Sequence, residues 1–129
     1  MLAIVIGLPG SGKTYFSNSL GIKVYDDFIR DFYSGNLVKD LKNNIDVCIN
    51  DPRLCNYETF QKFITIFERI IKKDNIILYL FQNDAIKCKM NANKKVEKFI
   101  ETYSVLYDPY NYKGYNCNIL PVYSQINLQ

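Results

Sequence analysis

The sequence contains no histidine and few arginines, which stand only at positions 30, 53 and 69. A catalytic base in this chain must therefore be sought among the carboxylates. The four cysteines are Cys48, Cys55, Cys88 and Cys117, and no two of them form a Cys-x-x-Cys pair. Structural zinc sites take about four Cys or His ligands at close spacing, so the sequence argues against such a site. Cys48 stands in an apolar run, and we expect it to be a buried and unreactive side chain.

Long apolar runs and strong charge are also missing. No segment approaches the ~20 apolar residues of a membrane-spanning helix. The first ten residues, MLAIVIGLPG, lack the basic region of a signal peptide. A net charge of +3 is too small to indicate a partner. We therefore expect a cytoplasmic or otherwise intracellular protein that does not associate with a membrane.

The 129 residues suit a single domain spanning 1–129, and 48% of them are hydrophobic, which is enough for a core. Predicted strands alternate with predicted helices along the whole chain. The strands are expected at 2–7, up to about 25, at 45–51, at 75–81 and within 117–126. The helices are expected at 13–20, 27–33, 57–71 and from the lysine-rich stretch 87–98 to about 107. This order predicts an α/β fold with three layers, in which helices cover both faces of a mostly parallel five-stranded sheet.

Two segments carry the clearest structural signals. The run 2–7, LAIVIG, is continuous and apolar, as is typical of a central strand buried on both faces. In the predicted helix 57–71, aromatic and aliphatic residues recur at the spacing of one helical face, which indicates core packing. The tyrosine-rich stretch 107–116 is expected to be a loop.

The stretch GLPGSGKT, residues 7–14, matches the phosphate-binding loop G-x-x-x-x-G-K-[ST], also called the Walker A motif. It follows a predicted strand and opens a predicted helix, as the motif requires. The residues expected to hold the phosphates of a nucleoside triphosphate are Gly7, Pro9, Gly10, Ser11, Gly12, Lys13 and Thr14. We expect Lys13 to face solvent and reach the β- and γ-phosphates, and the Thr14 hydroxyl to bind Mg²⁺. The alternative is a glycine-rich turn, which does not need a lysine and a hydroxyl at these positions.

Other nucleotide-binding classes fit the chain less well. A GTPase would carry Asn-Lys-x-Asp, but the nearest sequence, residues 93–96, has no aspartate. Motor proteins and large ATPases are longer and carry further motifs. A small phosphotransferase that uses ATP and Mg²⁺ is therefore the class we expect.

Three carboxylates follow predicted strands, at the edge where ligands bind in open α/β sheets. Asp26 and Asp27 come after the second strand, and either is a candidate to accept a proton from the phosphate acceptor. The alternative role for one of them is to cap the following helix. Asp51 ends the third strand and is either a metal ligand or the start of a turn into Pro52.

The segment KCKMNANKK follows the fourth strand, where a basic lid over the phosphates would lie. Lys89 and Lys94 are predicted to be catalytic cations of this lid, with Lys87 and Lys95 beside them. The alternative is a solvated helix face.

Taken together, IVIGLPGSGKTYFSNSL, YDDF, INDPRLCNYETF and LYLF with CKMNANKK resemble the kinase domain of the polynucleotide kinase group and related P-loop kinases such as the zeta-toxin-like proteins. The resemblance covers residues 1–98, and only the phosphate loop is specific. It implies that Asp26 is the base acting on a 5′-hydroxyl and that lid residues clamp the γ-phosphate. The family usually has arginines in this lid, whereas Met90 and lysines stand here.

Three functions stay open on the sequence. The first is a phosphotransferase acting on a hydroxyl, with a nucleic acid 5′ end as candidate acceptor. The second is a nucleoside or nucleotide kinase whose base pocket uses Phe28, Phe32 and Tyr33. The third is a nucleotide-binding structural or interaction subunit that has lost catalysis.

Overall fold

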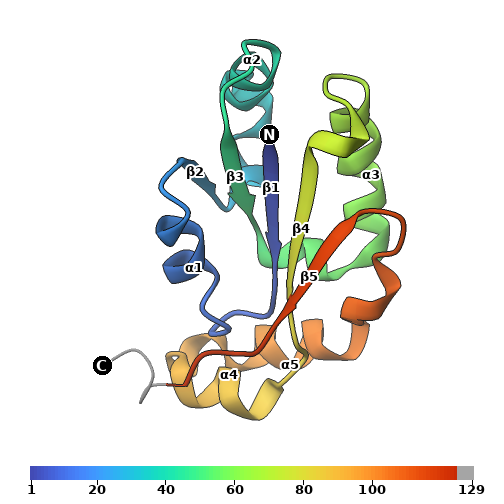
Figure 1. The fold of residues 1–129 in the computed structure, drawn as a ribbon. Helices are drawn as coiled ribbons and strands as arrows, with labels where there is room; N and C mark the ends of the chain where they lie inside the picture. Colours follow the sequence, from blue (N-terminus) through green and yellow to red (C-terminus); the bar gives the residue numbers. More distant parts are fainter. Residues whose placement is uncertain (125–129) are drawn as a thin grey trace.

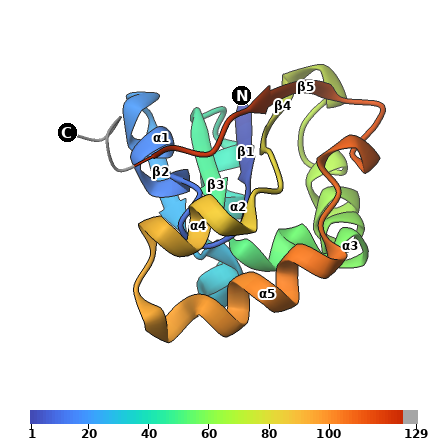
Figure 2. The same ribbon diagram turned by 90° about the horizontal axis from the view of Figure 1, so that it is seen from below.

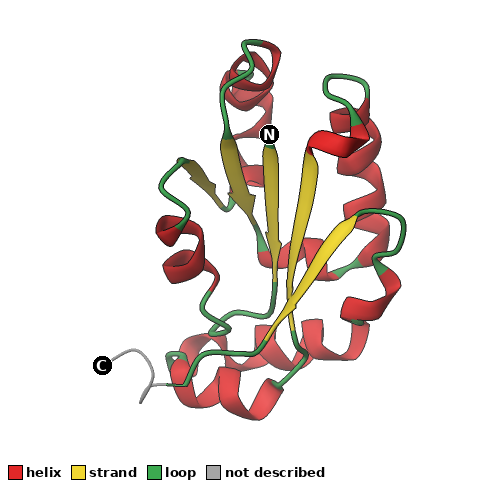
Figure 3. Cartoon of the chain, in the orientation of Figure 1, coloured by secondary structure: helices red, strands yellow, loops and turns green. Residues whose placement is uncertain are grey.

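The structure is a computed structural model, and it describes residues 1–124. Five parallel strands form one sheet in the order β2-β3-β1-β4-β5 (Figures 1 and 3). Their bounds are β1 Leu2–Ile6, β2 Lys23–Asp26, β3 Val47–Asn50, β4 Ile76–Phe81 and β5 Asn116–Leu120. The predicted α/β class and the five-stranded sheet are confirmed, and every strand pair is parallel.

Strand β1 lies at the centre of the sheet and is buried along its whole length. Its register pairs Leu2 with Val47 of β3 and with Ile76 of β4. Because side chains alternate across a strand, Leu2, Ile4 and Ile6 join one core cluster while Ala3 and Val5 join another. A continuous apolar run is what a strand packed on both faces requires, so the sequence pattern and the position agree.

Helices cover both faces of this sheet. Helix α1 (Lys13–Ser19) packs on the face of Ala3 and Val5, with Phe16 at the contact. Helices α2 (Asn36–Lys42) and α3 (Tyr57–Glu68) pack on the opposite face. The predicted aromatic stripe of α3 is confirmed as core: its buried members are Phe60, Phe63, Ile64 and Phe67.

Two further helices lie at the carboxyl ends of the strands. Helix α4 (Ala85–Asn91) and helix α5 (Glu97–Leu106) run across this edge of the sheet, as the view from below shows (Figure 2). After β5 the chain passes back along α4 toward the loop between β1 and α1. Helices α4 and α5 therefore cover part of the edge of the sheet at which the carboxyl ends of the strands lie.

Short 3-10 helices complete the structure. They are η1 (Phe28–Ser34), η2 (Pro52–Cys55), η3 (Lys73–Asn75), η4 (Lys94–Val96) and η5 (Pro109–Asn111). None of the helices within residues 1–124 combines the length and hydropathy that a membrane span needs.

Several element predictions differ from the structure. Helix α2 was not predicted, because Gly35 before it was taken as a breaker; the structure uses Gly35, at φ 81°, as its N-cap. The predicted helix 57–71 ends at Glu68, three residues early. The predicted lid helix is divided into α4 and α5, because Ala92 and Asn93 are extended. The window for the fifth strand reached residue 126; the strand is Asn116–Leu120, and 125–126 lie outside the described residues.

Candidate active site

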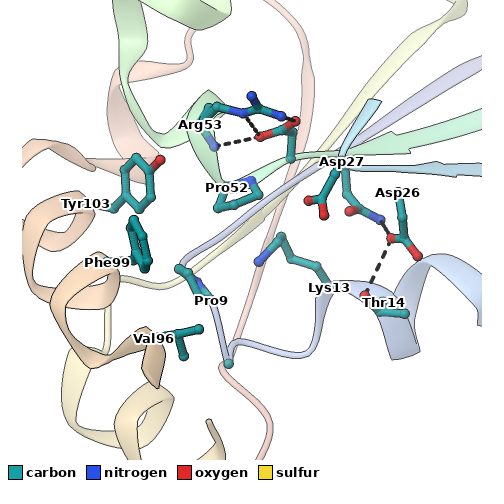
Figure 4. A pocket seen from close by; sticks show the side chains of 13 residues that line it. Pro9, Lys13, Thr14, Asp26, Asp27, Pro52, Arg53, Val96, Phe99 and Tyr103 are labelled. Atoms are coloured by element: carbon teal, nitrogen blue, oxygen red, sulfur yellow. Dashed lines mark hydrogen bonds and ion pairs between the residues drawn. The ribbon is translucent and has the colours of Figure 1, made fainter. Parts of the chain in front are cut away.

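A cavity of about 540 Å³ opens at the carboxyl ends of β1, β2 and β3 (Figure 4). One side of it is polar and comes from the phosphate loop and the strand ends. The other side comes from α5. The lining residues are Pro9, Gly10, Lys13, Thr14, Asp26, Asp27, Asn50, Asp51, Pro52, Arg53, Val96, Phe99 and Tyr103. The cavity therefore brings together most of the residues predicted from the loop and the strand ends.

The phosphate loop has the backbone that its glycines predict. Gly10 and Gly12 adopt φ of 83° and 105°, in the left-handed region that favours glycine. A Cβ on Gly10 would collide with the Cys88 carbonyl oxygen, and a Cβ on Gly12 with the ring of Tyr123. The backbone N–H groups of residues 10, 12, 13 and 14 have no hydrogen-bond acceptor within residues 1–124. A glycine-rich loop whose N–H groups are not used in this part of the protein is suited to an anion.

Segments from the end of the chain hold this loop from outside. The Asn91 side-chain amide donates to the carbonyl of Gly10 at 3.1 Å and also to the carbonyl of Tyr123. The Tyr123 N–H donates to the Ser11 carbonyl at 3.2 Å. The Tyr123 ring packs edge-on against Tyr15, with centroids 5.2 Å apart. The phosphate loop is therefore fixed by α4 and by the residues that follow β5.

Lys13 and Ser11 are the buried polar side chains of the loop. Lys13 is only 9% exposed and its Nζ donates to the Leu8 carbonyl at 3.0 Å, so the prediction that Lys13 faces solvent is wrong. Burial lowers the pKa of Lys13, while the carboxylates of Asp27 and Asp51 oppose the shift. The Ser11 hydroxyl is fully buried and has no hydrogen-bond partner among residues 1–124. A buried hydroxyl without a partner is costly, but Ser11 does not line the cavity, so this hydroxyl is not placed to meet a ligand there.

Asp26 lies next to Thr14 and is anchored by a residue that the sequence did not single out. The Asn50 amide donates to Asp26 Oδ1 at 2.6 Å and to the Ser17 hydroxyl at 3.1 Å. The Thr14 hydroxyl lies 3.5 Å from the same Oδ1. Asp26 Oδ2 therefore stays available, while Asn50, itself buried, sets the orientation of the carboxylate.

Asp27 points into the same cavity from a strained backbone. Its φ is 47°, a left-handed conformation that costs a non-glycine residue about 1 kcal/mol or more. It precedes η1, yet its side chain makes no capping hydrogen bond. Asp27 therefore does not cap the following helix through its side chain, which was the alternative role for one of the two aspartates. Its carboxylate faces Lys13 in the cavity.

Asp51 is occupied by Arg53. Its Oδ1 accepts from Arg53 N and Nε, at 3.0 and 2.8 Å, and its Oδ2 accepts from Arg53 Nη2 at 2.7 Å. The N–H of Ile29 adds a bond to Oδ2 at 3.2 Å. The carboxylate is fully buried and caps η2, which is the turn alternative stated above. These contacts use the oxygens that a metal ion would need.

The predicted lid lies where expected but presents different residues. Val96 of η4 and Phe99 and Tyr103 of α5 face the cavity, and Phe99 is 57% exposed. Lys89 forms an ion pair with Glu101 at 2.7 Å, and Lys94 is exposed. Neither of these lysines lines the cavity, nor do Lys87 and Lys95. The cations that the structure brings to the cavity are Lys13 and Arg53.

The aromatic residues predicted to bind a nucleobase do not line the cavity together. Phe28 is 2% exposed and packs against Phe63 and Phe67 in the core. Phe32 packs on the same rings. Only Tyr33 is exposed, and it lines a neighbouring cavity. The prediction of a base pocket built from Phe28 and Phe32 is therefore wrong.

Comparison with known proteins gives one relative. The chain is 41% identical, over 133 aligned positions, to "Uncharacterized protein R277" of Acanthamoeba polyphaga mimivirus. The match covers 95% of this chain and 96% of the viral protein. The chain belongs to the same family as R277. No protein-family model matches the sequence. The name of R277 states no activity, so the comparison shows that the two proteins are related and gives no information about their function.

The sequence contained signals for four of the residues it did not single out as cavity-lining. Val96, Phe99 and Tyr103 recur at intervals of 3 and 4, the spacing of one helical face. Asn50 ends a buried strand directly before Asp51, at the edge where ligands bind. The pairing of Arg53 with Asp51 had no signal beyond proximity in the chain.

The donor set fits a nucleoside triphosphate and one Mg²⁺. The loop N–H groups and Lys13, which lines the cavity, suit phosphate oxygens. For the metal, Thr14 Oγ1 and Asp26 Oδ1 are adjacent oxygens, and Oδ1 also accepts from Asn50, whereas both oxygens of Asp51 are engaged. No group of three or more acidic, Cys or His side chains suited to a metal exists within residues 1–124. Mg²⁺ usually keeps several waters and binds through substrate phosphates, so two protein oxygens suffice.

Proposed function

We propose that this protein transfers the γ-phosphoryl group of ATP to a hydroxyl acceptor, as a P-loop kinase. The observation that carries the proposal is the convergence of Lys13, Thr14 and the anchored carboxylate of Asp26 on one cavity. A phosphate-binding loop alone would serve many purposes. An oriented carboxylate with a free oxygen beside it serves proton removal from a hydroxyl.

The residues have distinct parts in the proposed transfer. The loop N–H groups and Lys13 bind the triphosphate and counter its charge. Thr14 and Asp26 Oδ1 would hold Mg²⁺, which neutralises phosphate charge when bound. The acceptor oxygen bonds to the γ-phosphorus, and the bond from that phosphorus to the bridging oxygen breaks. The hydroxyl proton passes to Asp26 Oδ2, and the nucleoside diphosphate leaves.

Asn50 and Asp27 support Asp26 in this proposal. The Asn50 amide bonds to Oδ1 and so fixes the carboxylate of Asp26, which lines the cavity. Asp27, which has a strained backbone and whose side chain makes no capping hydrogen bond, is the alternative proton acceptor. The two roles separate in Asp26→Asn and Asp27→Asn, because an amide keeps the shape of the side chain and accepts no proton.

The test is a transfer assay with labelled ATP over 5′-hydroxyl DNA and RNA, nucleosides and nucleotides. We expect Asp26→Asn to bind ATP normally and to lose ~10²–10⁴ in rate. We expect Lys13→Ala to lose ATP binding in calorimetry, with Lys42→Ala, an exposed lysine of α2, as matched control. Normal ATP binding by Lys13→Ala would contradict the phosphate site. Full transfer by Asp26→Asn would assign the proton to Asp27.

One observation favours a second candidate, a nucleotide-binding subunit without transfer. The α5 side of the cavity presents Val96, Phe99 and Tyr103, and Lys89 and Lys94 lie outside it. A lid without a cation loses a contribution that can reach ~10³–10⁵ in rate. ATP binding that depends on Lys13, with no product on any acceptor, would support this candidate over the kinase.

A further inference from the structure

A second cavity is lined by residues of η1, η2, α3 and α5. It measures about 370 Å³, and the residues that it shares with the active-site cavity are Arg53 and Tyr103. Small-molecule sites measure about 300–1,000 Å³, so this cavity has room for a ligand of about one ring. Neither the loop 7–14 nor any of the three aspartates at the strand ends lines it. The cavity is therefore distinct from the proposed nucleotide site.

The side chains around this cavity carry positive charge and no negative charge. Two of them, Arg53 and Lys62, are cations, and no Asp or Glu side chain within residues 1–124 lines the cavity. Lys62 is exposed and forms no ion pair in that part of the chain. A cleft lined by one sign of charge attracts ligands of the other sign, so the cavity favours an anion.

Arg53 is held by a buried carboxylate and retains free donors. Its Nε and Nη2 donate to Asp51 at 2.8 and 2.7 Å, and Asp51 is fully buried. Of the five N–H bonds that a guanidinium carries, the other three have no acceptor within residues 1–124. Because Asp51 fixes the guanidinium before a ligand arrives, less entropy is lost on binding. The planar donors suit the paired oxygens of a phosphate or a carboxylate.

Three uncharged donors line the same cavity. The hydroxyl groups of Thr59 and Tyr103 make no hydrogen bond with residues 1–124. The Asn56 side chain uses its oxygen, which accepts from Glu58 N at 3.0 Å, and its NH₂ group has no acceptor in the same range. Burial raises the pKa of Tyr103, so its hydroxyl keeps its proton at neutral pH and can donate. The cavity thus offers several donors to one anionic group.

The remaining lining is aliphatic or aromatic. It consists of Ile29, the buried ring of Phe63 and the ring of Tyr33, which is 87% exposed. An inorganic ion would leave these surfaces in contact with water, whereas a ligand with a ring would cover them. The cavity therefore suits a ligand that combines an anionic group with an aromatic ring.

We propose that this cavity is a separate binding site for a small aromatic anion. Arg53 holds the phosphate or carboxylate group, and Thr59 and Lys62 add contacts to its oxygens. The ring of the ligand packs on Phe63 and Ile29. Both kinds of anionic group present paired oxygens to Arg53, and the experiment distinguishes them. The inference does not rest on the proposed function, because no step of the phosphate transfer uses this cavity.

Calorimetry on the full chain, without nucleotide, measures binding of phenyl phosphate, benzoate and the uncharged benzyl alcohol. We expect the better of the two anions to bind about tenfold or more tightly than benzyl alcohol, because the alcohol makes no charge-assisted hydrogen bond. A preference for phenyl phosphate or for benzoate supports the site and identifies the anionic group. Inorganic phosphate should bind more weakly than phenyl phosphate, because it has no ring to cover the apolar wall.

Conservative variants test the location. Thr59→Val keeps the shape, removes the hydroxyl and should weaken anion binding about 2- to 10-fold. Arg53→Lys keeps a positive charge beside Asp51 but lacks the planar fork, and should weaken binding about tenfold or more. Thr65→Val, another threonine of α3, and Lys42→Ala lie outside the cavity and should bind as wild type does.

Two further measurements keep the test decisive. Lys62→Ala should weaken binding about 2- to 5-fold at low salt and less at high salt. Urea denaturation checks the folding of Arg53→Lys, and if that variant is unfolded, Thr59→Val and Lys62→Ala decide without it.

The phosphate loop also suits anions, so the same titrations are made with Lys13→Ala. Binding that persists in Lys13→Ala and weakens in Thr59→Val supports the inference. Binding that is lost in Lys13→Ala and unchanged in both Thr59→Val and Lys62→Ala would overturn it. Equal binding of benzyl alcohol and the two anions, or no binding of either anion, would also overturn it.

Failure of this inference and failure of the proposed function give different results. Anion binding that depends on Thr59, with no phosphate transfer to any acceptor, supports the second site and contradicts the kinase. Phosphate transfer by a protein that binds neither phenyl phosphate nor benzoate supports the kinase and contradicts the second site.

Discussion

Replacing Asp51 with alanine removes a fully buried carboxylate that accepts hydrogen bonds from Ile29 N and from N, Nε and Nη2 of Arg53. Arg53 is 43% exposed and can turn to water, so it is not left as a buried charge. The capping bond to Arg53 N is worth ~1 kcal/mol, and a charge-assisted bond such as that to Ile29 N ~1.5–3 kcal/mol. We therefore expect a loss of about 3–4 kcal/mol in the free energy of unfolding, near the range for breaking a buried ion pair.

Urea denaturation measures this loss. With a slope of ~1–3 kcal/mol per molar urea, the midpoint should fall by at least ~1 M. Asp46→Ala is the matched control: that carboxylate is 58% exposed, pairs with the N-terminal amine, and should cost ~1 kcal/mol or less. Asp51→Asn keeps the shape and should lie between the two.

The Asp51 variants also test the prediction that Asp51 is a metal ligand. If Asp51 only holds Arg53 and caps η2, then ATP with Mg²⁺ should stabilise wild type and Asp51→Asn by the same increment. A loss below ~1 kcal/mol in Asp51→Ala, together with a Mg²⁺ increment that disappears in Asp51→Asn, would refute this reasoning and restore Asp51 as a ligand.

Three further outcomes are expected. Asp27→Gly should be more stable to urea than Asp27→Ala by ~1–2 kcal/mol, because the backbone there is left-handed; the reverse order would contradict the strain. Asn91→Ala should weaken ATP binding in calorimetry about tenfold, ~1.4 kcal/mol, because the bridge from Gly10 to Tyr123 is lost, and unchanged affinity would contradict this bracing role. Burial raises the pKa of Cys48 and Cys88 to about 11 and of Cys55 to about 12. Unfolded thiols ionise first, so stability should fall as pH rises from about 9 to 11, by up to ~1.4 kcal/mol per pH unit per thiol, and Cys48→Ala should flatten the slope measured by urea titrations across this range.

The sequence was sufficient for the sheet and for the backbone of the loop 7–14, because both depend on local patterns. Apolar continuity identifies β1, and Pro52, which has no N–H, ends the third strand's ladder. The glycines of the loop have the backbone that the motif demands. Helix α2 was missed because a glycine before a helix can either break it or cap it, and only the packing of Leu37 and Leu41 on the sheet decides between the two.

The local sequence pattern did not predict which side chains of the lid segment face the cavity. A lysine-rich stretch and an apolar face share the same segment, and the sequence does not state where that segment packs. The buried side chain of Ile100 fixes the rotation of α5, which then turns Phe99 and Tyr103 to the cavity. Lys89 meets Glu101 only because α4 and α5 lie together. Such contacts join residues far apart in the chain, and no periodicity encodes them.

The contact between Tyr123 and the phosphate loop makes the site dependent on synthesis of almost the whole described chain. Residues 7–14 leave the ribosome first, and the Tyr123 N–H that holds the Ser11 carbonyl follows more than a hundred residues later. At ~5–20 residues per second, this delay is roughly 6–20 s. Until Phe81 has been made β1 lacks its neighbour β4, and throughout the delay the loop lacks its outer support. Under the proposed function, a nucleotide would therefore stabilise mainly those chains that have been made past β5.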